Sequence, residues 1–126
     1  SEIAEMVRRI EAIGRKYEIE IATFGHAGDG NLHPTVATDA RDHEEMERVE
    51  AAFADIFAAA LDLGGTITGE HGVGAMKAPY LEWKLGAAGI DVMKGIKLAF
   101  DPHGIMNPLK MFAKSAKKRL VQGGGA

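Results

Sequence analysis

The sequence predicts an α+β fold in which helices pack on a small antiparallel sheet, followed by a helical C-terminal segment. Apolar residues recur at three-and-four spacing in several segments, and shorter segments rich in β-forming residues lie between them. Glycine or proline separates most of these segments. Hydrophobic residues make up 46% of the 126 residues and charged residues 26%, which is typical of a globular protein with its own core.

The N-terminal third of the chain is expected to form a helix and two strands. Residues 2–13 carry apolar residues on one face of a helix, and Gly14 is the expected helix stop. Strands are expected at residues 17–24 and 32–38, and Pro34 places the second strand near a sheet edge or a bulge.

The rest of the chain is expected to be mainly helical. A long helix begins near residues 39–42 and ends before Gly64, because acidic residues fill its first turn and glycines follow its last. A third short strand is expected at residues 66–68, and helices at 80–85 and 90–100. Three short strands leave exposed sheet edges, so we interpret the chain as a piece of a larger protein.

The composition excludes several classes of site and partner. Fifteen Lys and Arg against eighteen Asp and Glu give a net charge of −3, which argues against a general nucleic-acid-binding surface. The absence of cysteine excludes disulfides, thiolate zinc sites, iron–sulfur clusters and cysteine nucleophiles. The last stretch carries Lys110, Lys114, Lys117, Lys118 and Arg119, which we interpret as a solvated charge run rather than a membrane or nucleic-acid contact.

Two histidines flank a glycine-rich turn between the first two strands. If Asp29 and Gly30 are the central residues of a two-residue hairpin turn, His26 lies opposite His33 with Cβ atoms about 5 Å apart. Two neutral imidazoles at that separation can share a metal ion. Spacing alone leaves open whether they are metal ligands or an ordinary surface pair.

A second glycine-rich segment supplies a candidate third ligand and a candidate base. Glu70 ends the expected third strand among glycines, and His, His and carboxylate is a common ligand set of catalytic zinc. His71 follows at once, and histidine side chains ordinarily exchange protons near neutral pH. The residues alone also allow a purely polar turn, whereas the spacing of residues 69–77 does not match a phosphate loop or a dinucleotide fingerprint.

Three segments of the sequence resemble a known family. Residues 24–33 (FGHAGDGNLH), 64–74 (GGTITGEHGVG) and 100–108 (FDPHGIMNP) are similar, in this order, to three signatures of the C-terminal domain of FAD-linked oxidases. Within that family, the strongest resemblance is to the group of D-lactate dehydrogenase, D-2-hydroxyglutarate dehydrogenase and the flavoprotein component of glycolate oxidase. The resemblance implies that residues 1–126 are a partial ferredoxin-like substrate and metal domain.

The resemblance also implies roles for particular residues. His26, His33 and Glu70 would bind a divalent metal, zinc or manganese, and His71 would be the catalytic base. The reaction implied is oxidation of a D-2-hydroxy acid, with the hydroxyl proton going to His71 and hydride to the flavin. Family members acting on hydroxy-diacids carry Asn where this chain has Thr35, so Thr35 is the expected substrate-binding residue.

The cofactor and partners follow from the same resemblance. FAD would be held mainly by an N-terminal FAD-binding domain that this sequence lacks, with Asn107 as a cofactor contact, so this chain alone is expected to be inactive. The family usually has Gly where this chain has Leu109. The expected partners are a small 2-hydroxy acid, the FAD domain, and other oxidase subunits or a second copy. The expected location is cytoplasmic, peripheral at the inner membrane face in the complete enzyme.

Two other functions are compatible with the residues taken by themselves. One is a stand-alone metal-binding or interaction module without redox activity. The other is a zinc hydrolase in which Glu70 and His71 activate water.

Overall fold

The computed structural model describes residues 2–112 of the chain. These residues form two compact units, residues 2–65 and residues 66–112. Most of the basic C-terminal stretch lies outside the described residues.

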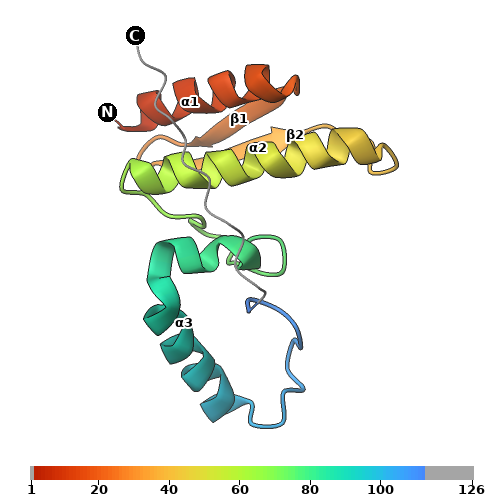
Figure 1. Ribbon diagram of the computed structural model, residues 1–126. Coiled ribbons are helices and arrows are strands. Elements are labelled where there is room, and N and C mark those ends of the chain that lie inside the picture. Colours follow the sequence, from red (N-terminus) through yellow and green to blue (C-terminus); the bar gives the residue numbers. More distant parts are fainter. Residues whose placement is uncertain (1, 113–126) are drawn as a thin grey trace. The chain divides into compact units, whose positions relative to one another are not determined.

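The first unit is a β-hairpin with two helices packed on it (Figure 1). Its elements, in chain order, are α1 (Glu2–Tyr17), β1 (Ile21–His26), β2 (Asn31–Val36) and α2 (His43–Asp62). The buried core joins the two helices, and its members are Met6, Ile10, Ile13, Ala52, Ile56 and Ala59. Ile21 of β1 and Leu32 of β2 pack against this core, so the helices cover one face of the hairpin.

The two helices begin and end for local reasons. The side chain of Asp42 accepts a hydrogen bond from the Glu45 backbone N–H at 2.9 Å and caps α2. The predicted end of α1 at Gly14 is wrong, because the helix continues to Tyr17. Tyr17 extends the apolar face one turn further and packs against the core, which offsets the low helix propensity of Gly14.

Two polar bridges also connect α1 to α2. The buried carboxylate of Asp55 accepts hydrogen bonds from Lys16 Nζ at 2.8 Å and from the Tyr17 hydroxyl at 2.7 Å. Arg9 and Asp62 form a second, exposed ion pair at 2.6 Å. The interface between α1 and α2 therefore combines apolar packing with one buried carboxylate.

The second unit contains a short 3-10 helix, η1 (Ala78–Tyr80), and α3 (Leu81–Phe100). Gly86 inside α3 has a φ of 67° and a ψ of 172°, so the helix is kinked there. The two helices expected at 80–85 and 90–100 are thus present as the two arms of one kinked element. Among residues 2–112, no helix is long and apolar enough to span a membrane.

The third strand expected at residues 66–68 is wrong. Those residues are irregular, and the described part of the second unit contains no strand. A β-forming segment becomes a strand only when a neighbouring strand accepts and donates backbone hydrogen bonds. Within residues 2–112, the sheet consists of β1 and β2 alone.

The predicted fold class is confirmed. The first unit is a small antiparallel sheet with helices packed on it, and its helix–strand–strand–helix order is that of the middle of a ferredoxin-like βαββαβ arrangement. The helical segment that was expected to follow is α3.

Candidate functional site

The hairpin register differs from the prediction by two residues. His26 lies opposite Asn31, and His33 lies opposite Phe24. The predicted direct pairing of His26 with His33 is therefore wrong, and the two histidines are diagonal neighbours.

The turn explains the shifted register. It contains four residues, 27–30, instead of two, and the carbonyl of His26 accepts hydrogen bonds from Asp29 N at 3.4 Å and Gly30 N at 3.0 Å. A two-residue type I′ turn needs positive φ at both central residues, but only Gly30 (φ 76°) has it. The Asp29 carboxylate instead accepts a hydrogen bond from the Asn31 N–H at 3.0 Å.

The shift of register keeps both histidines on one face of the sheet. Side chains alternate with a period of two, so a slip of two residues changes the partner but not the face. The ring centroids of His26 and His33 are 5.5 Å apart with the ring planes nearly perpendicular. One ring nitrogen of His26 lies within 4.8 Å of one ring nitrogen of His33. Two nitrogens bound to one zinc ion are about 3.4 Å apart, so small rotations of the rings suffice.

This face of the hairpin carries further residues of interest. It is the face away from the core, and it holds Thr35, which pairs with Ala22 and lies two positions after His33. Phe24 stacks on the His33 ring, with centroids 5.3 Å apart and planes 12° from parallel. The sequence analysis missed this stack, although the two-residue spacing of Phe24 and His26 in one strand was a signal for it.

Gly25 allows the two strands to approach. A Cβ atom at this position would lie 2.1 Å from the Asn31 carbonyl oxygen, which no side chain tolerates. The glycine beside His26 is thus required by close backbone contact, and it faces away from the histidines.

The loop that carries Glu70 and His71 belongs to the second unit. The two side chains are partly to largely exposed, and His71 Nε2 lies 3.8 Å from a Glu70 carboxylate oxygen. The Thr68 hydroxyl donates a hydrogen bond to the Gly72 carbonyl at 3.0 Å, which closes the loop around this pair. Within this unit, the structure brings the candidate ligand and the candidate base next to each other.

A second loop of this unit, residues 101–112, is organised by Asp101. Its buried carboxylate accepts hydrogen bonds from the backbone N–H groups of Ile105 and Met106, both at 3.0 Å, and from the Lys97 ammonium. The hydrogen bond from Lys97 holds the pKa of Asp101 below its ordinary value, and the two backbone N–H groups act in the same direction. The sequence analysis assigned Asp101 no role.

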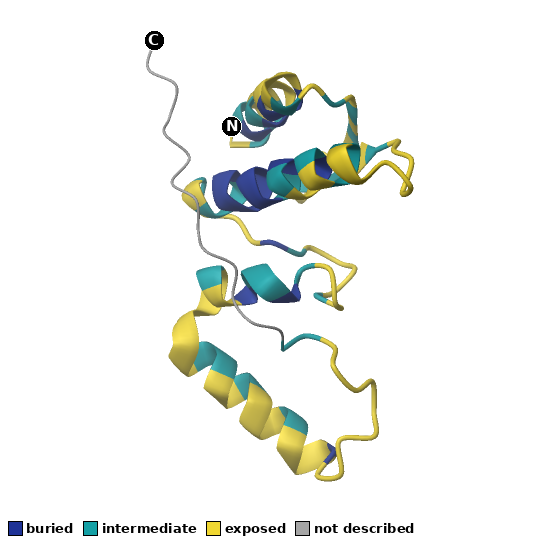
Figure 2. Ribbon diagram, turned by 45° about the vertical axis from the view of Figure 1, so that its right-hand side comes forward, coloured by how far each residue is buried: buried dark blue, intermediate teal, exposed yellow. Residues whose placement is uncertain are grey.

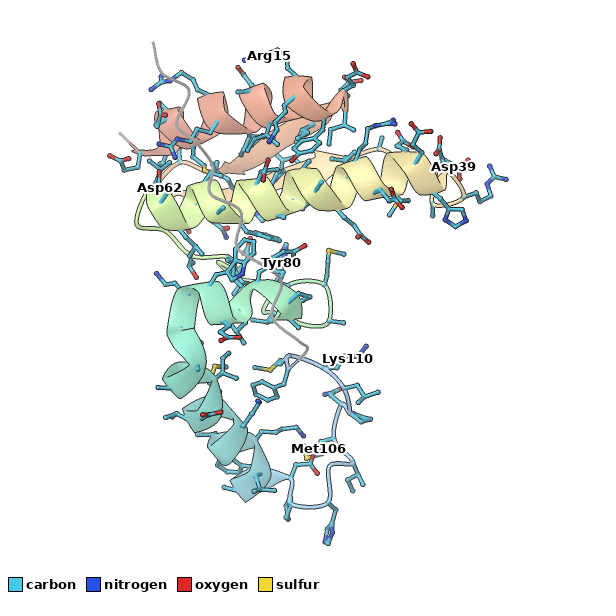
Figure 3. All side chains as sticks on the ribbon, in the orientation of Figure 1. Arg15, Asp39, Asp62, Tyr80, Met106 and Lys110 are labelled. Atoms are coloured by element: carbon cyan, nitrogen blue, oxygen red, sulfur yellow. The ribbon has the colours of Figure 1, made fainter. Side chains whose placement is uncertain are left out.

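The loop then returns to the Glu70–His71 segment. Met111 N donates a hydrogen bond to the Gly74 carbonyl at 2.9 Å, and Figure 3 shows Met106 and Lys110 on this returning loop. Asn107, the expected cofactor contact, is exposed here with a φ of 45°. The residues that follow the third signature segment thus contact the end of the second.

Comparison with known proteins assigns the chain to a family. The sequence model for the C-terminal domain of FAD linked oxidases matches residues 1–111. The chain belongs to this family. The resemblance of the three signature segments is therefore confirmed over nearly the whole chain.

Three curated relatives show how similar the chain is to other members. It is 69% identical to the glycolate oxidase subunit GlcD of Bacillus subtilis (strain 168) over 96% of this chain and 26% of that protein. It is 37% identical to a D-lactate dehydrogenase of Anaerostipes hadrus, over 90% and 24%. It is 42% identical to a D-2-hydroxyglutarate dehydrogenase of Stutzerimonas stutzeri (strain A1501), over 88% and 25%. This member of the FAD linked oxidase family thus spans about a quarter of the length of these relatives.

Proposed function

We propose that the chain is the C-terminal, substrate- and metal-binding part of an FAD-dependent oxidoreductase. The complete enzyme oxidises a D-2-hydroxy acid such as glycolate or D-lactate to the 2-oxo acid. The observation that carries the proposal is the pair of imidazoles on the outer face of the β1–β2 hairpin, in a chain of the FAD linked oxidase family. The names of the relatives support the hydroxy-acid substrate class.

We propose His26, His33 and Glu70 as ligands of a divalent ion, zinc or manganese. The donor set fits, because the hairpin presents two imidazoles on one face and Glu70 adds an exposed carboxylate. When bound, the ion supplies Lewis-acid chemistry that makes the substrate hydroxyl more acidic. Thr35, on the same face as His33, is the proposed contact to the substrate.

His71 is the proposed catalytic base. Its imidazole accepts the proton of the substrate hydroxyl while the adjacent carbon gives up hydride, so the alcohol loses two electrons and becomes a carbonyl. FAD, held by the flavin-binding part, would supply the hydride acceptor. The neighbouring Glu70 carboxylate lies 3.8 Å from Nε2, so the proposed base and the proposed ligand are adjacent. Asn107 is the proposed FAD contact from the returning loop.

The ligand assignment can be tested on the chain itself. We expect the purified chain to bind one Zn²⁺ or Mn²⁺ ion in calorimetric titration, and His33→Ala to weaken binding at least tenfold. His43→Ala, at the exposed start of α2, is the matched control and keeps the wild-type affinity. Equal affinity of wild type and His33→Ala would refute the ligand role.

The redox role needs the flavin-binding part of a longer chain. Replacing the matched segment of the Bacillus subtilis relative by this chain gives a chimera whose flavin absorbance reports reduction by D-lactate or glycolate. We expect His71→Asn to slow flavin reduction at least about a hundredfold in the chimera. The chain alone, mixed with FAD and substrate, is expected to show no turnover.

The outcomes separate the proposal from its alternatives. Metal binding without flavin reduction in the chimera supports a stand-alone metal-binding module. Hydrolysis of ester substrates by the metal-loaded chain, abolished by His26→Ala, supports a zinc hydrolase. A cytoplasmic location, peripheral at the membrane in the complete enzyme, stays a prediction.

A further inference from the structure

One face of α3 is apolar and exposed along three helical turns. Val92, Ile96 and Phe100 follow one another at four-residue spacing, and they are 64%, 56% and 82% exposed. Figure 2 shows the longer arm of α3 mainly in the colour of exposed residues, in contrast to the buried stretch of α2. Leaving three large apolar side chains in contact with water is unfavourable, and covering them would be favourable.

The residues between these three make the face continuous. At 100° per residue, Ala88, Gly95 and Ala99 fall in the same sector of the helix as Val92 and Ile96, and all three are exposed. We call the six residues Ala88, Val92, Gly95, Ile96, Ala99 and Phe100 the α3 apolar face. No member is charged, and the small residues allow another backbone to approach closely.

The other sides of α3 are different. Lys97 and Met93 are half-buried, and Lys97 contacts the Asp101 loop of the same unit. Lys94 is exposed and lies on the side of the helix opposite Val92, whereas Asp91 borders the apolar face beside Gly95. Leu98, which is 62% exposed, lies between Asp91 and Lys94 around the helix. The helix therefore has one side used within its unit, one side of mixed polarity, and one apolar side that lies open.

The loop that carries Asn107 also exposes apolar side chains. Ile105 is 77% exposed, Met106 59% and Leu109 96%. A large exposed apolar patch on a folded unit is typical of an interaction site. The surface adjoins the loop that we assigned to the flavin side of the enzyme.

We propose that the α3 apolar face is the docking surface for the flavin-binding part of the oxidase. The chain covers only 24–26% of the length of its relatives, so about three quarters of each of those proteins is further polypeptide that can cover this face. An apolar surface of that polypeptide covers the α3 apolar face, next to the loop that carries Asn107. This inference rests on the proposed function, because it assumes an FAD-binding part.

The absence of cysteine from the sequence makes a direct test available. Ile96→Cys places a single thiol on the face, and Lys94→Cys places one on the opposite side of the helix as a matched control. The labelling rate with N-ethylmaleimide is measured by mass spectrometry of the peptide around each position. It is compared between the isolated chain and the chimera with the Bacillus subtilis relative.

We expect the thiol at position 96 to react at least tenfold more slowly in the chimera than in the isolated chain. The thiol at position 94 is expected to react within twofold of the same rate in both. Val92→Cys is a second probe of the same face, in case Ile96→Cys does not fold. An unchanged rate at both position 96 and position 92 would overturn the proposal.

Other occupants give other results. Protection at position 96 in the isolated chain, together with a dimeric mass in light scattering, identifies a second copy and overturns the proposal. If vesicles of phosphatidylcholine and phosphatidylglycerol slow the labelling of position 96 in the isolated chain as much as the chimera does, the partner is a lipid surface. That result also overturns the proposal. Metal titration of the same samples separates the two proposals. If position 96 is protected in the chimera but the chain binds no metal, the proposed ligand set is contradicted and the docking surface is not.

Discussion

The buried carboxylate of Asp55 is predicted to be a main polar contribution to the stability of the first unit. Its side chain is 3% exposed and accepts hydrogen bonds from Lys16 Nζ at 2.8 Å and the Tyr17 hydroxyl at 2.7 Å. The perturbation is Asp55→Ala, which removes both bonds between α1 and α2 without disturbing the backbone of either helix.

The magnitude follows from the exposure of each partner. The Tyr17 bond to a charged acceptor is partly buried, and its loss costs about 1.5–2 kcal/mol. Lys16 is 61% exposed, so its ammonium returns to water, and loss of that ion pair costs only about 0.5–1 kcal/mol. The free energy of unfolding should fall by about 2–3 kcal/mol.

Urea unfolding followed by circular dichroism at 222 nm measures this change. With a slope of about 1 kcal/mol per molar urea for a unit of this size, the midpoint should fall by about 2–3 M. Asp62→Ala is the matched control, because the Arg9–Asp62 pair also joins α1 to α2 but Asp62 is 66% exposed. That variant should lose at most about 1 kcal/mol. Equal losses for the two variants would refute the argument from burial.

Three further predictions concern the backbone and one acidic group. Glu18 ends α1 with a φ of 54°, so Glu18→Gly should raise stability by about 0.5–1 kcal/mol, seen as a higher melting temperature; a lower one would contradict the backbone argument. Gly25→Ala should destabilise the hairpin by about 2–3 kcal/mol in urea unfolding and weaken metal binding, because the new Cβ meets the Asn31 carbonyl; wild-type values for both would contradict this. The lowered pKa of Asp101 means that its ionised form stabilises the second unit at pH values above about 4 and that this contribution is lost as the pH falls further. The fluorescence of Trp83, in the same unit, should therefore show unfolding at lower urea at pH 3 than at pH 5, and Asp101→Asn should reduce that difference.

The sequence predicted the face of each histidine but not its partner. Alternation along β1 and β2 depends only on local backbone geometry, so it is readable from sequence. The register depends on the conformation of the turn, and composition did not distinguish a two-residue turn at Asp29 and Gly30 from the four-residue turn observed. Because the error was an even number of residues, His26 and His33 stay on one face of the hairpin.

The missing third strand and the role of Asp101 show a different limit. Ile67 lies in a segment of β-formers and is buried, yet burial alone does not make a strand without a partner. The sequence indicates Asp101 only as a helix breaker, whereas its carboxylate fixes the following loop through two backbone N–H groups and Lys97. The strand depends on a partner strand elsewhere in the chain, and the role of Asp101 depends on backbone N–H groups. Neither kind of hydrogen-bond partner can be recognised from residue type.

The stack of Phe24 on His33 has a consequence for the entropy of ligand binding. An exposed histidine in a strand exchanges among several side-chain rotamers, and binding must select one of them. The nearly parallel aromatic ring, 5.3 Å away, restricts His33 before any ligand arrives. The conformational entropy of the His33 side chain is thus lost when the hairpin folds. Ligand binding does not lose it again, so the affinity of the imidazole for its ligand is higher than that of a freely rotating histidine.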